Sequence, residues 1–202
     1  RVLDDNRVFI VGGNKNRDTN LPDTQNQTMI YDISNKKFSL SKNLNLKRWY
    51  GSVVITGDQK MLIFGGEDVV TKKVSTTPEM IDLKNIDQGW QLLEQADSNN
   101  LFGEKDADEW NYPRAFVTSD GNIVGISYNK TWVMDVNNNY RISNTGKIPL
   151  VKSGISKVLE HSNPNFDHNE KDHLKLLTIG SAVGSTNSVV MIEKDKLLVF
   201  GG

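Results

Sequence analysis

The stretch "RWYGSVVITGDQKMLIFGG", residues 48–66, decides the fold. It contains an apolar run, a polar turn at Gly57-Asp58, a second apolar run and the pair Gly65-Gly66. Two short apolar runs joined by a turn that contains Gly and Asp are typical of a β-hairpin. The glycine pair indicates a sharp turn after the second strand, where a side chain would clash or φ must be positive.

The same pattern recurs along the chain. "RVFIVGG" (7–13) and "KLLVFGG" (196–202) repeat the apolar strand with its two glycines, and we interpret "GNIVGIS" (121–127) as a degenerate copy. A period of roughly 50 residues with this signature is typical of the kelch type of β-propeller. The longer interval before the last copy indicates an insertion.

A second strand pair is predicted after each glycine pair. In "TMIYDISNKKFSL" (28–40) we expect a strand at 28–32, a polar turn, and a further strand that Phe38 opens. Trp90 and Tyr140 take the place of Phe38 in the next two units. An aromatic residue at this point of each unit is predicted to pack on the neighbouring sheet.

The whole chain is therefore predicted to be all-β. Further hairpin turns are predicted at Asp120-Gly121 and Lys194-Asp195, and no segment has sustained helical periodicity. We expect residues 1–202 to form a single, partial β-propeller domain of about three to four blades, with both ends inside the repeat array. Propellers close with roughly 4 to 8 blades, and seven are expected here.

Composition narrows the classes of function. The chain has 202 residues, a formal net charge of −1 and no cysteine. Without a basic stripe, no nucleic-acid partner is expected, and the apolar runs are far shorter than the roughly 20 residues of a membrane span. The absence of cysteine removes disulfides, thiolate metal sites and cysteine nucleophiles from these residues.

Three stretches resemble a known family. Arg48-Trp49-Tyr50, ahead of a hairpin that ends in Gly-Gly, resembles the corresponding run of the galactose oxidase and glyoxal oxidase group of copper radical oxidases. "WNYPRAFVTSDGNIV" (110–124) looks like the segment before that family's next hairpin, and "STNSVVMIEKDKLLVFGG" (185–202) looks like the hairpin after it. The resemblance implies a propeller of the galactose oxidase central-domain type and an extracellular or cell-surface location.

The resemblance also implies a chemistry. In this family a Tyr at the position of Tyr50 is a copper ligand and radical site, cross-linked to a Cys, and the enzyme oxidises small aldehydes or alcohols with O₂ to give H₂O₂. Arg48 would lie beside the oxidised ring. The Cys is expected before Arg1, and the Tyr-His and His ligands after Gly202. The chain departs from the galactose oxidases at Glu67-Asp68, where they place a stacking Trp.

Other interpretations stay open. The alternative to an oxidase is a non-catalytic kelch-type scaffold that presents loops 14–28, 67–77 and 160–173 to a protein or glycan partner. A propeller hydrolase or lyase is a third class, for which no residues stand out. The three histidines, all between residues 161 and 173, are interpreted as part of a solvated loop, with a metal patch as the alternative.

Overall fold

The computed structural model describes residues 1–3, 5–14, 23–103, 110–147, 188–193 and 196–200. Antiparallel sheets dominate this part of the chain, and α1 (Asn99–Phe102) is its one α-helix. The all-β prediction is therefore confirmed. The strands are β1 (Arg7–Val11), β2 (Thr28–Asp32), β3 (Lys37–Leu40), β4 (Ser52–Ile55), β5 (Lys60–Phe64), β6 (Glu79–Asp82), β7 (Gln91–Leu92), β8 (Arg114–Val117), β9 (Ile123–Ser127), β10 (Lys130–Asp135), β11 (Arg141–Lys147), β12 (Ser188–Glu193) and β13 (Lys196–Phe200).

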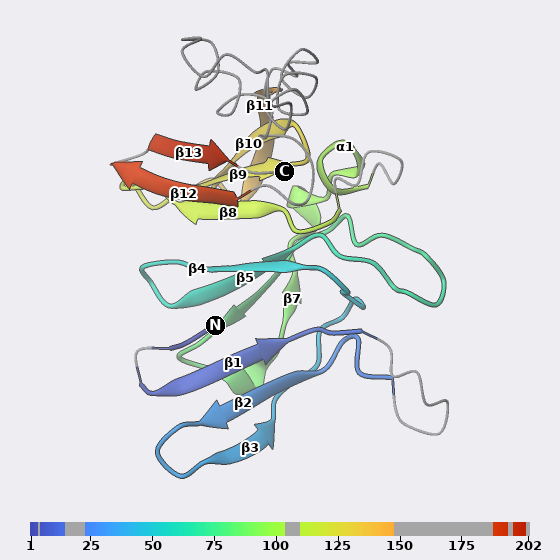
Figure 1. Cartoon of the computed structure of the whole chain (residues 1–202), viewed down its shortest axis with the longest axis vertical. Helices are drawn as coiled ribbons and strands as arrows, with labels where there is room; N and C mark the ends of the chain where they lie inside the picture. Colours follow the sequence, from blue (N-terminus) through green and yellow to red (C-terminus); the bar gives the residue numbers. More distant parts are fainter. Residues whose placement is uncertain (4, 15–22, 104–109, 148–187, 194–195, 201–202) are drawn as a thin grey trace, which may run out of the picture.

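The strands form separate sheets in which neighbours in space are neighbours in sequence. The sheets are β1-β2-β3, β4-β5-β6-β7, β8-β9-β10-β11 and β12-β13, and none of them closes on itself. The sheets lie one above another in Figure 1, and β4 contacts β8, the first strand of the following sheet. The β4–β5 turn lies at one side of the stack and the β5–β6 loop at the other (Figure 1).

Two hairpin turns repeat the same hydrogen bonds. At the β4–β5 turn the Thr56 hydroxyl donates to Asp58 and to the Lys60 carbonyl, which also accepts from the Thr56 N–H. At the β8–β9 turn Thr118 makes the same contacts with Asp120 and Asn122. The turns predicted at Gly57-Asp58 and Asp120-Gly121 are thus confirmed. The one predicted at Lys194-Asp195 lies outside the described residues.

An aspartate ends each of the strands β2, β6 and β10. Asp32, Asp82 and Asp135 each accept, through Oδ1, the backbone N–H two residues further on, at 2.8, 2.8 and 3.1 Å. The short aspartate side chain accepts backbone N–H groups of the turn that follows it. These hydrogen bonds take over where the hydrogen bonds between the strands end. This local rule explains why the polar turn follows at the same point in three units.

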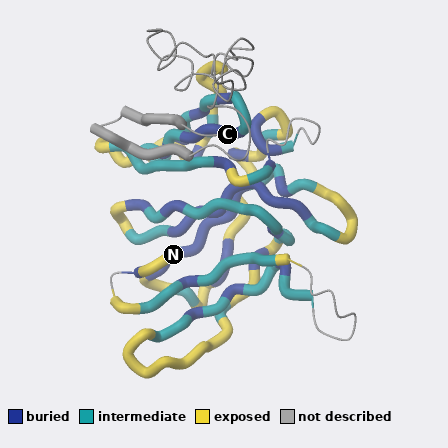
Figure 2. Tube along the Cα trace, in the orientation of Figure 1, coloured by how far each residue is buried: buried dark blue, intermediate teal, exposed yellow. Residues whose placement is uncertain are grey.

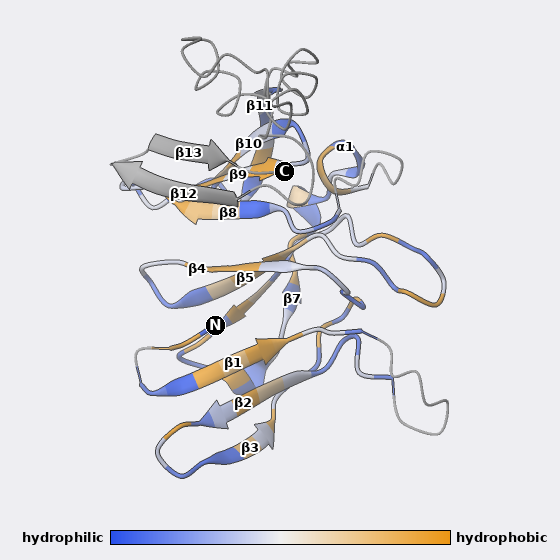
Figure 3. Cartoon of the chain, viewed as in Figure 1, coloured by the Kyte–Doolittle hydropathy of each residue, from blue (hydrophilic) through white to orange (hydrophobic). Residues whose placement is uncertain are grey.

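The core lies between the sheets. Residues 61–64 of β5 are all buried, so this strand packs on both faces (Figure 2). Met61 and Ile63 pack with Phe9 and Ile30 of the first sheet. Leu62 and Phe64 point to the other face of β5 and pack with the third sheet. Strands buried on both faces have near-continuous apolar runs, as "MLIF" does in the hydropathy view (Figure 3).

The prediction for the three aromatic residues is confirmed in part. Trp90 and Tyr140 are buried, and the Trp90 ring packs edge-on against Phe9 of the preceding sheet, with centroids 6.3 Å apart. Phe38 instead is 65% exposed and contacts Tyr31 of its own sheet. Tyr140 is also not the counterpart of Phe38 in strand pairing. Phe38 of β3 pairs with the residue before Asp32, and the residue that pairs with the one before Asp135 is Ile142.

Within the copy "GNIVGIS", Gly125 does not take the place of the glycine pair. Gly125 lies inside β9 and pairs with Ala115, as Ile63 pairs with Val53. Its role follows from packing, since a Cβ at Gly125 would lie 2.0 Å from the Trp132 indole. Gly65 has the expected role: its φ is 62°, and a Cβ would lie 2.4 Å from the Trp110 carbonyl oxygen.

Candidate functional site

Tyr50 lies at the entrance to β4, and Tyr112 lies at the same point before β8. The two residues are joined by a hydrogen bond from the Tyr112 N–H to the Tyr50 carbonyl at 2.9 Å. Both have a left-handed backbone, with φ of 65° and 48°. This conformation is strained for a bulky residue and persists only where its surroundings hold it. The fold therefore brings two equivalent tyrosines from consecutive sheets together.

Their side chains belong to a cluster of four aromatic rings. The Trp49 ring stacks on Tyr50 with centroids 3.7 Å apart and planes 24° apart. The Tyr112 ring lies 4.5 Å from Tyr50 at 31°, and Trp110 lies 6.4 Å from it at 11°. Tyr50 is partly buried, and Tyr112 is 39% exposed. Sequence reasoning sought a stacking Trp only after the glycine pair and so missed Trp49.

Charge near the cluster comes from Arg114. Its guanidinium lies 5.6 Å from the centre of the Tyr112 ring and donates to the Tyr112 carbonyl oxygen. Burial, the proximity of Tyr50 and a side-chain hydrogen bond with Tyr50 raise the pKa of Tyr112, and Arg114 opposes this rise. The Tyr112 phenol therefore keeps its proton more firmly than an exposed tyrosine does.

Arg48 lies in the core. Its Nε donates to Glu79 Oε1 at 3.1 Å, and its Nη1 and Nη2 donate to the Gly65 and Thr77 carbonyls at 2.6 and 2.5 Å. The side chains of Arg48 and Glu79 are both fully buried. Glu79 went unnoticed in the sequence, where the one signal is a charged residue at the start of the apolar strand "EMID". The observed partners of Arg48 join the strand-entrance segment to β5 and β6.

The described side chains do not match the set of ligands that a Cu(II) ion needs. Cu(II) takes several ligands, commonly imidazole nitrogens with other N and O donors in a tetragonal set. Tyr50 and Tyr112 offer two phenol oxygens, and within the described ranges no group of three or more His, Cys, Asp or Glu side chains could hold a metal ion. The described residues therefore do not complete a copper site. The three histidines lie outside them.

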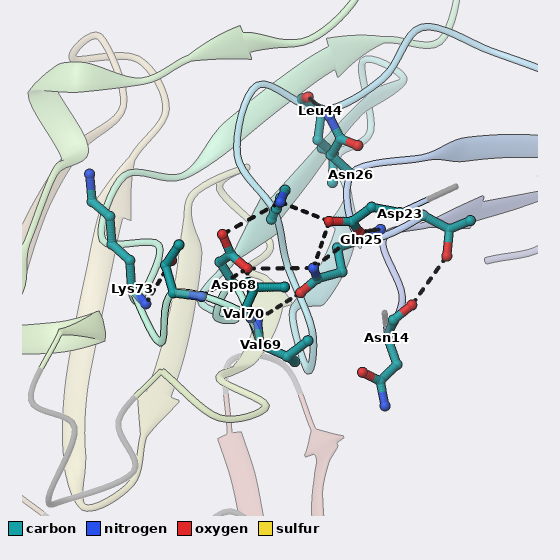
Figure 4. A network of polar contacts seen from close by, with 12 residues as sticks. Asn14, Asp23, Gln25, Asn26, Leu44, Asp68, Val69, Val70 and Lys73 are labelled. Carbon is teal, nitrogen blue, oxygen red and sulfur yellow. Dashed lines mark hydrogen bonds and ion pairs between the residues drawn. The ribbon is translucent and has the colours of Figure 1, made fainter. Parts of the chain in front are cut away.

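A second polar site is built from two of the loops predicted to face a partner (Figure 4). Gln25, which is fully buried, accepts the Val69 N–H at 2.7 Å and donates to Asp23 at 3.0 Å. Lys47 Nζ lies 2.7 Å from Asp23 and 3.6 Å from Asp68. These contacts join the end of the 14–28 loop to the β5–β6 loop, so the two loops are held as one surface. Loop 160–173 lies outside the described residues.

The carboxylates of this network are held ionised. Burial alone would raise the pKa of Asp23, but hydrogen bonds from Lys47 and Gln25 outweigh it and the pKa is lowered. Burial of Asp68 is likewise outweighed, chiefly by the backbone N–H of Val70, and its pKa is lowered. Both side chains therefore act as fixed negative acceptors at neutral pH.

An open pocket of about 320 Å³ adjoins the network. Its polar lining comes from the 45–47 segment and the β5–β6 loop and consists of Asn45, Lys47, Asp68, Thr71, Lys73, Ser75, Thr76 and Thr77. Ser75 Oγ donates to the Lys47 carbonyl at 3.0 Å, and the hydroxyls of Thr76 and Thr77 donate to Asp97. The walls of the pocket are thus fixed by hydrogen bonds that cross between segments.

The sequence matches no family model, and no curated protein is significantly similar to it. In the part of the chain that the structure describes, no helix has the length and apolar character that crossing a membrane requires.

Proposed function

We propose that the sheets are consecutive blades of a kelch-type β-propeller, which residues 1–202 form as one domain. Three features support this: strand order follows the chain in every sheet, the β4–β5 and β8–β9 turns repeat their hydrogen bonds, and β4 contacts β8. By register, β1-β2-β3 corresponds to the last three strands of a blade and β12-β13 to the first two. This arrangement corresponds to three to four blades of a seven-bladed ring.

The function that we propose for this propeller is that of a non-catalytic scaffold that binds a saccharide in the loop pocket. The observation that carries the proposal is the pocket of about 320 Å³ between segment 45–47 and the β5–β6 loop, whose walls the Gln25 and Lys47 contacts hold in place. Ligand pockets of roughly 300–1,000 Å³ with a few fixed polar groups are typical of small-molecule sites.

As a ligand for this pocket, a saccharide fits better than a protein partner. The pocket is concave, and its hydroxyl, ammonium and carboxylate groups pair with the alternating donors and acceptors of a sugar. Lys73 lies on the exposed part of the loop, so its ammonium group is available to a ligand without disturbing the buried network.

A saccharide panel tests the proposal. The labelled intact protein is screened against immobilised glycans, and each hit is measured by titration calorimetry. Removing one charged hydrogen-bonding partner costs roughly 1.5–3 kcal/mol, so Lys73→Ala is expected to weaken binding at least tenfold. Lys84→Ala is the matched control, because Lys84 lies in the turn after β6, at the other end of that strand. Equal loss in both variants, or binding only to a protein, contradicts the proposal.

A second candidate is the copper radical oxidase, with Tyr50 as the redox-active ligand and small aldehydes or alcohols as substrates. The contact that favours it is the Trp49 ring stacked on Tyr50 at 3.7 Å, since a stacked indole shields and stabilises an oxidised ring. It requires a cysteine and imidazole ligands beyond those described here, and it would be an extracellular enzyme. Intact protein loaded with Cu(II) in air should then lose two hydrogens and join the Tyr50 peptide to a Cys peptide. A copper-loaded protein with an unmodified Tyr50 contradicts this candidate.

A further inference from the structure

The contact between Tyr50 and Tyr112 has a chemical consequence of its own, which holds whichever function the protein has. Their ring centroids are 4.5 Å apart and their planes 31° apart, which is a close, tilted ring contact. At this separation carbon atoms of the two rings are in van der Waals contact.

We propose that Tyr50 and Tyr112 are a site of oxidative cross-linking, at which a peroxidase and hydrogen peroxide join the two rings as dityrosine. Each phenol gives up one electron and one proton, and the two phenoxyl radicals form a carbon–carbon bond between the positions beside their hydroxyls. Each ring then moves one ring hydrogen to its oxygen, which restores both phenols. One H₂O₂ takes up the two electrons and two protons and becomes two waters, so the protein loses two hydrogens.

The structure favours this pair over the other tyrosines. The chain has five tyrosines, and all five lie in the described residues. The ring of Tyr31 contacts Phe38, and Tyr140 is buried in the core. Tyr50 and Tyr112 alone, among these five, make a tyrosine–tyrosine ring contact.

Access and backbone geometry also support the proposal. Tyr112 is 39% exposed, so an oxidant in solution reaches the pair through it. The backbone hydrogen bond between the two residues holds their main chains together at the strand entrances. A radical on Tyr112 therefore meets Tyr50 within its own molecule before it meets a second protein molecule. The new bond would link the starts of β4 and β8 and so join two consecutive sheets covalently.

Peroxidase treatment of the intact protein tests the proposal. Dilute protein is treated with horseradish peroxidase and a small excess of H₂O₂, and dityrosine fluorescence, intact mass and tryptic peptides are measured. We expect a loss of two hydrogens, no dimer on denaturing gels, and one cross-linked pair made of the Tyr50 and Tyr112 peptides. A cross-link between other tyrosines, or dimers without an intramolecular product, overturns the proposal.

Matched variants separate this site from general oxidation. Tyr50→Phe and Tyr112→Phe each keep the ring and should each abolish the intramolecular product, while Tyr128→Phe leaves its yield unchanged. Circular dichroism checks that each variant is folded. If a variant does not fold, peptide mapping of the wild-type protein still identifies the linked pair. A product that persists in both Tyr50→Phe and Tyr112→Phe refutes the assignment, and so does a product lost in Tyr128→Phe. This readout differs from a Tyr50–Cys link, so the result does not depend on the oxidase candidate.

Discussion

Replacing Glu79 by glutamine keeps the shape of a fully buried side chain and removes its charge. The carboxylate accepts four hydrogen bonds: from the Asn45 N–H at 2.7 Å, Asn45 Nδ2 at 2.8 Å, the Leu46 N–H at 3.1 Å and Arg48 Nε at 3.1 Å. Glutamine has one acceptor oxygen in place of two, and it leaves the Arg48 guanidinium without its counter-charge. Breaking a buried ion pair in this way costs about 3–5 kcal/mol.

Urea unfolding followed by circular dichroism measures this loss. With a slope of about 2 kcal/mol/M, a cost of about 4 kcal/mol lowers the midpoint by about 2 M. Asp5→Asn is the control, because it breaks the exposed Arg7–Asp5 ion pair, whose N–O distance is 2.6 Å. Such exposed pairs contribute about 1 kcal/mol or less.

The reasoning also predicts how Arg48 and Glu79 are coupled. Because Arg48→Met already removes the charge that Glu79 neutralises, the double variant with Glu79→Gln should cost less than the sum of the single changes. Additive effects would refute the idea that the pair acts as one unit. A Glu79→Gln midpoint within error of Asp5→Asn would refute the estimate of its magnitude.

Two further predictions concern the glycine pair and the loop network. Gly65→Ala should destabilise the protein by more than about 1 kcal/mol, since its φ is 62° and its Cβ meets the Trp110 oxygen; Gly57→Ala, with no atom within 4 Å of its Cβ, should be near neutral in the same urea assay. A similar loss in both would contradict the turn argument. Asp23 has a lowered pKa, so its contribution to stability is present above the unfolded value of about 3.9 and is lost as the pH falls through the folded value. The stability difference between wild type and Asp23→Asn should therefore be larger at pH 7 than at pH 3, and a difference that does not change with pH would count against it.

Local patterns in the sequence predicted the strands and turns. The apolar runs around Gly57-Asp58 and Asp120-Gly121 became hairpins, and the strand expected at 28–32 is β2. These features depend on residues within a few positions of one another, since turn residues set the reversal and the apolar alternation sets which face is buried. The sequence does not separate a glycine that a turn needs, such as Gly65, from one that packing needs, such as Gly125.

The tertiary structure decided which residues meet. Arg48 finds its counter-charge in Glu79, Gly125 makes room for Trp132, and Tyr112 comes against Tyr50. Each of these contacts joins residues of different strands or repeats, and no local spacing in the sequence specifies them. Their geometry depends on how strongly the sheets twist and on how closely they pack. The sequence alone therefore determined an all-β chain and the places of its hairpin turns, whereas strand pairing and the packing of one sheet on the next determined which residues meet.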